Sequence, residues 1–279
     1  MTNREEQRKG RETAVNAQAA QTAEAAQAAK TIQAAQAALR EKAVAVTGLS
    51  KSYSGKKVID NLNLTIRPGQ IYGLLGANGA GKSTAVECIL GTRRADSGEV
   101  RILGMDPVTE RRHLFEQVGV QFQEASYPDR IKVRELCEET ACLYEKTADY
   151  RDLLRQFKLE DKADSMLSQL SGGQKQRLFI ILALIPGPRV VFLDELTTGL
   201  DTKSRREVWK CLLEMKDKGL SICLVSHFMD EVEMLCDQIG ILRDGMFVFE
   251  GTVKEAVDNS PYSNLEDAYL WWTQEEENR

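Results

Sequence analysis

Residues 76–84 read GANGAGKST, and this stretch carries the strongest structural signal in the chain. It matches the pattern G-x-x-x-x-G-K-[ST], follows the short apolar run IYGLLG and precedes STAVECILGT, whose apolar residues have helical spacing. Glycines let such a loop wrap closely around a phosphate, so that successive backbone N–H groups and the start of the helix point at the anion. The order strand, loop, helix therefore predicts a phosphate-binding loop in an α/β domain.

Two side chains of this loop are suited to a nucleotide bound with Mg²⁺. We expect Lys82 to reach the β- and γ-phosphates and Ser83 to bind the metal ion. An incidental glycine-rich turn is the alternative, and a chance match to the pattern arises in about one chain in a hundred of this length. The other loop residues that we expect around the nucleotide are Gly76, Asn78, Gly79, Gly81 and Thr84.

Residues 190–195, VVFLDE, form an apolar strand that ends in two carboxylates. The carboxyl ends of parallel strands open onto the ligand crevice of an α/β sheet. There, Asp194 can hold Mg²⁺ directly or through water, and Glu195 can orient and polarise a water for in-line attack on a γ-phosphate. Alone, such an acid pair is more often a helix cap or a turn. Beside a phosphate-binding loop, the catalytic interpretation is favoured.

Residues 170–177, LSGGQKQR, form a second anion-binding helix start in the same chain. With this motif the sequence resembles the nucleotide-binding subunits of ATP-binding-cassette (ABC) transporters. In that family the loop lies far from its own P-loop and completes the ATP site of the opposite subunit. The resemblance therefore implies a head-to-tail nucleotide sandwich dimer, in which Ser171, Gly173 and Gln174 would contact the partner's nucleotide.

Four further positions match the family in order along the chain. The resemblance implies that Tyr53 stacks on adenine and that Gln123 senses Mg²⁺ and the attacking water. Gln121 is the rival for the glutamine role. Asp201, in TTGLD, would face the partner's P-loop, and His227, in LVSHFMDEVE, would contact the γ-phosphate. Taken alone, the tyrosine is more often a half-buried strand residue and a lone histidine is more often structural.

The resemblance covers about residues 44–251 and has two departures. Leu196 and Thr202 stand where the family usually has proline, and we expect them to change the stiffness of their loops without removing a catalytic group. The segments SHFMDEVEMLCD and NLEDAYLWWT look like the drug-efflux and polymer-export (ABC-2-type) branch. Because all the catalytic side chains are present, an inactive phosphate-binding subunit is disfavoured.

The expected fold is an α/β P-loop NTPase core with a mostly parallel sheet, an antiparallel β subdomain and an inserted α-helical subdomain. Strand-like runs separated by helical segments predict βαβ units, and a charge-rich stretch at about 125–175 predicts the helical insertion. We expect the nucleotide-binding domain at 44–260 and an acidic tail at 261–279. Residues 1–43 are Ala/Gln-rich, and we expect a solvated helical or disordered extension there.

The composition is that of an ordinary globular protein, with 279 residues and a net charge of -5. The longest apolar run, 178–185, is too short for a membrane helix, which takes about 20 residues. The first residues show no secretory signal, so we expect a cytoplasmic location. We expect all six cysteines to be reduced and mostly buried, and the acidic balance gives no case for nucleic acid as a partner.

These observations predict an ATP-hydrolysing subunit of an ABC exporter, with ATP and Mg²⁺ as its ligands. The expected partners are a second ABC subunit and integral-membrane permease subunits, which would hold the chain at the inner face of the cell membrane. The alternative is a soluble ABC-type regulatory or complex-associated ATPase without a membrane partner. The sequence does not specify the transported substrate, because in this architecture specificity belongs to the membrane subunits.

Overall fold

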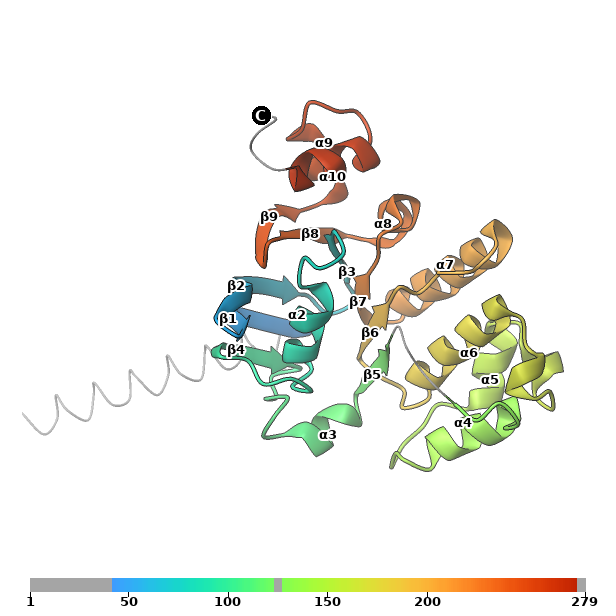
Figure 1. Cartoon of the computed structure of the whole chain (residues 1–279). Coiled ribbons are helices and arrows are strands. Elements are labelled where there is room, and N and C mark those ends of the chain that lie inside the picture. The colour runs from blue at the N-terminus through green and yellow to red at the C-terminus, as the bar shows by residue number, and fades with distance from the viewer. Residues whose placement is uncertain (1–41, 123–126, 275–279) are drawn as a thin grey trace, which may run out of the picture. The chain divides into compact units, whose positions relative to one another are not determined.

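The computed structural model describes residues 42–122 and 127–274. Residues 1–41 of the Ala/Gln-rich extension predicted at 1–43, and Gln123, lie outside the described residues. A central six-stranded sheet has the order β5-β6-β7-β3-β8-β9, in which the first five strands are parallel and β9 runs antiparallel to β8 (Figure 1). Its strands are β5 (Val118–Gln121), β6 (Val190–Asp194), β7 (Ser221–Val225), β3 (Ile71–Gly76), β8 (Gln238–Arg243) and β9 (Met246–Gly251).

The interior of the central sheet is built from strands that are largely apolar and buried. β3 is buried over its whole length, and it pairs with β7 on one side and β8 on the other, so that Leu74 lies opposite both Val225 and Gly240. Continuous apolar runs are typical of parallel strands buried on both faces. Because the strands are parallel, the ends of β3, β6 and β7 meet at one edge of the sheet, where ligands bind in this class of fold.

A second, antiparallel sheet has the order β2-β1-β4. Its strands are β1 (Val44–Tyr53), β2 (Lys56–Ile66) and β4 (Ser97–Ile102). The hairpin between β1 and β2 turns at Ser54 and Gly55, whose φ values are +49° and +82°. Two consecutive residues with positive φ form the tight turn that matches the twist of paired strands. This turn places Tyr53 at the end of the hairpin.

Helices α4, α5 and α6 form an inserted helical part between β5 and β6, to one side of the sheet in Figure 1. Their buried side chains, such as Leu136, Leu153 and Leu178, pack together in one cluster that continues onto α7. The predicted combination of parallel sheet, antiparallel sheet and helical insertion is therefore confirmed. The helical bounds are α2 (Lys82–Ile89), α3 (Arg111–Phe115), α4 (Val133–Ala141), α5 (Tyr150–Gln156), α6 (Gly172–Leu184), α7 (Thr202–Asp217), α8 (Met229–Leu235), α9 (Val253–Asp258) and α10 (Leu265–Thr273), with 3₁₀ turns at Glu160–Lys162 and Leu167–Gln169.

The acidic segment after residue 260 contains a packed helix. In α10, Leu265 and Ala268 are fully buried, and the indole N–H of Trp272 donates to the carbonyl of Ala256 at 3.0 Å. Arg243, the last residue of β8, donates to the carbonyl of Gln274 at 2.6 Å. The first contact joins α10 to α9, and the second joins the end of α10 to β8, which pairs with the strand before the P-loop. Among the described residues, no helix is both long enough and apolar enough to cross a membrane.

Candidate nucleotide-binding site

An open cleft of about 910 Å³ lies where β3, β6 and β7 end. The P-loop and the start of α2 supply most of its lining, and β1 and β2 contribute one residue each. Eleven residues predicted for the site line this cleft: Tyr53, Gly76, Asn78, Gly79, Gly81, Lys82, Ser83, Thr84, Asp194, Glu195 and His227. Val58, Ala77 and Tyr269 also line it. The structure thus brings together residues that are separated by more than 170 positions in the sequence.

Close packing explains two of the P-loop glycines. At Gly76, a Cβ atom would lie 2.5 Å from the carbonyl oxygen of Leu242, on the neighbouring strand. At Gly81, where φ is +106°, it would lie 2.7 Å from the carbonyl oxygen of Val58. Any side chain at either position would push the loop away from the sheet. The loop therefore keeps its backbone N–H groups at the start of α2 only with glycine at these positions.

Lys82, the first residue of α2, lies across the P-loop. Its Nζ donates to the carbonyl oxygens of Gly76 at 2.7 Å and Ala77 at 3.1 Å. Burial lowers the pKa of its ammonium group, and the nearby carboxylates of Asp194 and Glu195 act in the opposite direction. The amino group of Lys82 thus lies between the loop and the acidic end of β6, where phosphate oxygens can replace the carbonyls.

Asp194 and Glu195 have different environments although they are adjacent. The pKa of Asp194 is raised to about 6, mainly by burial and in part by the charge of Glu195, while the charge of Lys82 acts in the opposite direction. Glu195 turns the chain after β6 with a φ of +49°, and its N–H donates to the carbonyl of Val225 at 2.9 Å. Strained backbone of this kind concentrates at functional sites. The turn directs the Glu195 carboxylate toward His227, with 3.6 Å between Oε1 and Nδ1.

His227 follows β7 and has a side chain that is 45% exposed. Its ring lies against that of Phe228, with 4.1 Å between the centroids. Tyr53, which also lines the cleft, has two cations near its ring: Lys51 and Arg93 each approach the ring centroid to 5.5 Å. A half-exposed aromatic ring with fixed cations nearby can stack on a base and attract phosphates at the same time.

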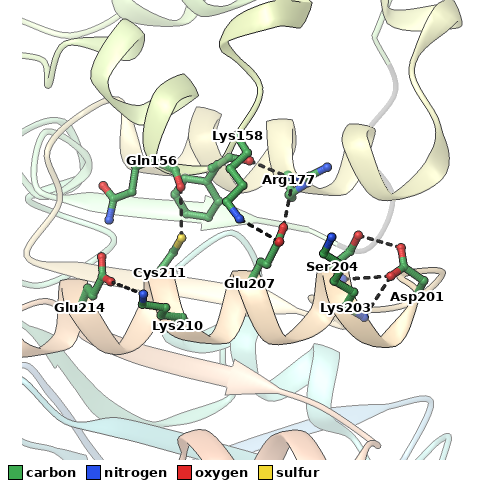
Figure 2. Close-up of polar contacts among 11 residues, drawn as sticks. Gln156, Lys158, Arg177, Asp201, Lys203, Ser204, Glu207, Lys210, Cys211 and Glu214 are labelled. Atoms are coloured by element: carbon green, nitrogen blue, oxygen red, sulfur yellow. Dashed lines mark hydrogen bonds and ion pairs between the residues drawn. The ribbon is translucent and has the colours of Figure 1, made fainter.

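Four predicted site residues lie outside this cleft. Ser171 caps α6 in a reciprocal arrangement with Gln174: the Gln174 N–H donates to the serine Oγ at 3.3 Å, and the Ser171 N–H donates to the glutamine Oε1 at 2.9 Å. Asp201 caps α7 and accepts hydrogen bonds from Lys203 and Ser204 (Figure 2). Ser171 and Asp201 are exposed. Together with Gly173, these residues form helix starts that do not line the P-loop cleft of their own chain.

Ion pairs of Glu207, on α7, with Lys158 and with Arg177, on α6, form a polar bridge between these two helices. Lys158 Nζ lies 2.8 Å from one carboxylate oxygen of Glu207, and Arg177 Nη1 lies 3.8 Å from the other (Figure 2). Arg177 also donates to the carbonyl of Phe157 at 3.1 Å. The hydrogen bond from Lys158 lowers the pKa of the Glu207 carboxyl. This bridge fixes the helix that begins after Ser171 against the helix that begins after Asp201.

The departures from the family pattern have simple structural settings. Leu196 is fully buried, and Thr202 is the first residue of α7, a position that suits proline but does not require it. Gln121 is buried at the end of β5 and does not line the cleft. Sequence reasoning missed Tyr269 as a cleft residue, because nothing in the pattern NLEDAYLWWT indicates that α10 packs near the P-loop.

Comparisons with known proteins agree on the family. A family model described as ABC transporter matches residues 59–198. Nod factor export ATP-binding protein I of Burkholderia thailandensis is 38% identical over 217 residues, which cover 76% of this chain and 71% of that protein. The protein of the same name from Rhizobium etli is 35% identical over 225 residues, which cover 77% and 70%. A solved structure described as the ATP-binding subunit of an ABC transporter superposes with a TM-score of 0.76 at 26% identity, and the match covers 83% of this chain and 99% of that one.

Proposed function

This chain belongs to the ABC transporter family as an ATP-binding subunit, and we propose that it hydrolyses ATP to drive export through separate membrane subunits. The export assignment follows the named function of its relatives, which are export ATP-binding proteins. The proposed working unit is a head-to-tail dimer bound through the permease to the inner face of the cell membrane. In this proposal the permease, and not this chain, determines which molecule is exported.

The observation that carries the dimer proposal is the separation of the predicted site into two parts. The phosphate-binding residues line one cleft, whereas Ser171 and Asp201 cap helices whose exposed starts lie outside it. The start of α6, which a neutral serine hydroxyl caps, suits an anion. At the start of α7, the carboxylate of Asp201 already accepts the N–H groups of Lys203 and Ser204. In a head-to-tail pair, the start of α6 in one subunit would close over the P-loop of the other.

The residues in the cleft also suit Mg²⁺. Ser83 and Asp194 both line it, and hydroxyl and carboxylate oxygens are the ligands that Mg²⁺ prefers. Because the pKa of Asp194 is about 6, this carboxyl is ionised at neutral pH and can hold a divalent cation. When bound, the ion would neutralise charge on the β- and γ-phosphates. Gln123 is a further proposed ligand.

The proposed chemistry is transfer of the γ-phosphoryl group to water. The P-loop N–H groups and Lys82 bind the phosphates, and Tyr53 stacks on the base. Glu195 accepts a proton from the attacking water. At the same time the water oxygen bonds to the γ-phosphorus, and the bond between that phosphorus and the ADP oxygen breaks. His227, which lies 3.6 Å from that carboxylate, donates toward the γ-phosphate and fixes its position.

Purification of the full-length chain from membranes without crosslinking tests this function. We expect an integral membrane protein to co-purify and the complex to hydrolyse ATP, whereas a Lys82→Ala complex should assemble without hydrolysis because phosphate binding is lost. Recovery of active ATPase only from the soluble fraction, with no integral partner, would instead favour the regulatory ATPase.

A further inference from the structure

Glu231, on α8, is a fully buried carboxylate with no solvent exposure. Its two oxygens are used by different elements. The hydroxyl of Ser226, just after β7, donates to Oε2 at 2.6 Å, and the indole N–H of Trp209, on α7, donates to Oε1 at 3.0 Å. One side chain therefore ties the end of β7 and the middle of α7 to α8.

The contact with Ser226 determines the backbone around His227. The Ser226 hydroxyl oxygen also accepts the backbone N–H of Phe228 at 3.1 Å, so the residues on both sides of His227 are fixed by one hydroxyl group. The Phe228 ring lies against the His227 ring. The guanidinium carbon of Arg205 lies 4.6 Å from the centroid of the same Phe228 ring. The backbone on both sides of His227 is thus held by the Ser226 hydroxyl, which Glu231 in turn holds in place.

The same carboxylate lies close to the segment that carries Glu195. Thr197, two residues further along, is fully buried beside Glu231. Glu195 itself is held to β7 by its N–H, which donates to Val225 at 2.9 Å. Both side chains proposed for the chemistry are therefore on backbone segments that converge on Glu231.

A buried carboxylate at this position has an energetic cost. Burial raises the pKa of Glu231, while the hydrogen bonds from Ser226 and Trp209, together with nearby Thr197 and Arg205, lower it. A leucine of similar volume would avoid the desolvation of a charge, and apolar replacements of buried charges are often neutral or stabilising. The carboxylate therefore calls for a role other than packing.

We propose that Glu231 is a positioning residue, which fixes the segment around His227 relative to Glu195 so that both meet the γ-phosphate in the correct geometry. This inference rests on the proposed function in so far as it concerns turnover. Its structural part, the effect of Glu231 on the His227 segment, can be measured without ATP.

The kinetic test compares three full-length variants. Glu231→Leu removes the tie, whereas Glu231→Gln keeps it, because an amide can accept from the indole and donate to the serine oxygen. Leu212→Ala is the matched control. Leu212 is fully buried on α7, the helix that Glu231 contacts through Trp209, and its truncation destabilises that helix without removing a hydrogen bond to Glu231. We expect Glu231→Leu to lower kcat on the order of tenfold to a hundredfold with ATP affinity nearly unchanged, as misplacement of reacting groups does. Glu231→Gln and Leu212→Ala should keep most of the activity below their unfolding temperatures.

The NMR chemical shifts of the histidine rings report on local geometry, and a general loss of stability does not change them in the folded protein. The chain has two histidines, and His113, on α3, is exposed and serves as the internal reference. In nucleotide-free Glu231→Leu, we expect the His227 ring signals to shift and the His113 signals to stay in place. Ser226→Ala, which removes one oxygen, should move the same signals and lower kcat if Glu231→Leu does not fold.

Two results would overturn the proposal. One is a His227 signal and a kcat that stay unchanged in either Glu231→Leu or Ser226→Ala. The other is a loss of turnover in Glu231→Gln as large as that in Glu231→Leu. If the wild-type complex hydrolyses no ATP, the proposed function fails, while the NMR comparison still decides whether Glu231 fixes the histidine segment.

Discussion

Replacement of Asp194 by asparagine is expected to stabilise the nucleotide-free chain. Folding raises the pKa of this carboxyl from 3.8 to about 6, mainly through burial. At about 1.36 kcal/mol per pKa unit, the difference corresponds to about 3 kcal/mol. Because the side chain keeps partial contact with solvent, screening reduces this to about 1–2 kcal/mol. The charged carboxylate thus opposes folding until a cation binds.

The sign of the effect sets its pH dependence. A carboxyl whose pKa is raised by folding favours the folded state below its unfolded pKa, and this contribution is lost as the pH rises through the folded value. The stability difference between Asp194→Asn and wild type should therefore be small near pH 4 and reach its full value above about pH 6.

Urea unfolding in EDTA at pH 4 and pH 8 measures this difference. Asp129→Asn, an exposed aspartate, is the matched control and should show no such pH dependence. Addition of Mg²⁺ and ATP should reverse the order of stability, since only the wild type keeps the carboxylate ligand. The reasoning is refuted if Asp194→Asn is no more stable than wild type at pH 8 in EDTA.

Three further predictions follow from the site and the sequence. Glu195→Gln should bind ATP but lose turnover by several orders of magnitude and accumulate as a nucleotide-bound dimer, as size-exclusion chromatography would show; near-normal hydrolysis would contradict its role as base. Glu207→Ala should lower the unfolding temperature by a few degrees and weaken dimer formation with ATP, because it frees α6 from α7, whereas exposed Glu214→Ala should do neither. Deletion of residues 1–40 should leave ATPase activity and thermal stability unchanged, and a clear loss of either would contradict the expectation of an inert extension.

The sequence was sufficient to predict the fold because its signals are local. Apolar runs that end in glycine or in carboxylates, such as 71–76 and 190–195, correspond to β3 and β6, and the structural relatives confirm the α/β architecture. Residue spacing within a loop likewise indicated which P-loop residues meet the nucleotide cleft.

Contacts between distant segments could not be predicted in this way. Tyr269 reaches the cleft because α10 packs on β8, and Glu231 is buried because three elements converge on α8. Neither residue belongs to a local pattern, and an acidic stretch such as MDEVE is more often a solvated helix face.

The central claim is that each ATP site is shared between two subunits. It is tested most directly by mixing Lys82→Ala and Ser171→Arg chains, both in a Glu195→Gln background, and measuring tightly retained ATP. Neither chain alone should retain ATP, whereas random pairing makes half of the dimers mixed, each with one intact site, so that the equimolar mixture retains about a quarter of the parent's ATP. Retention in the mixture no higher than the average of the separate chains would contradict a shared site.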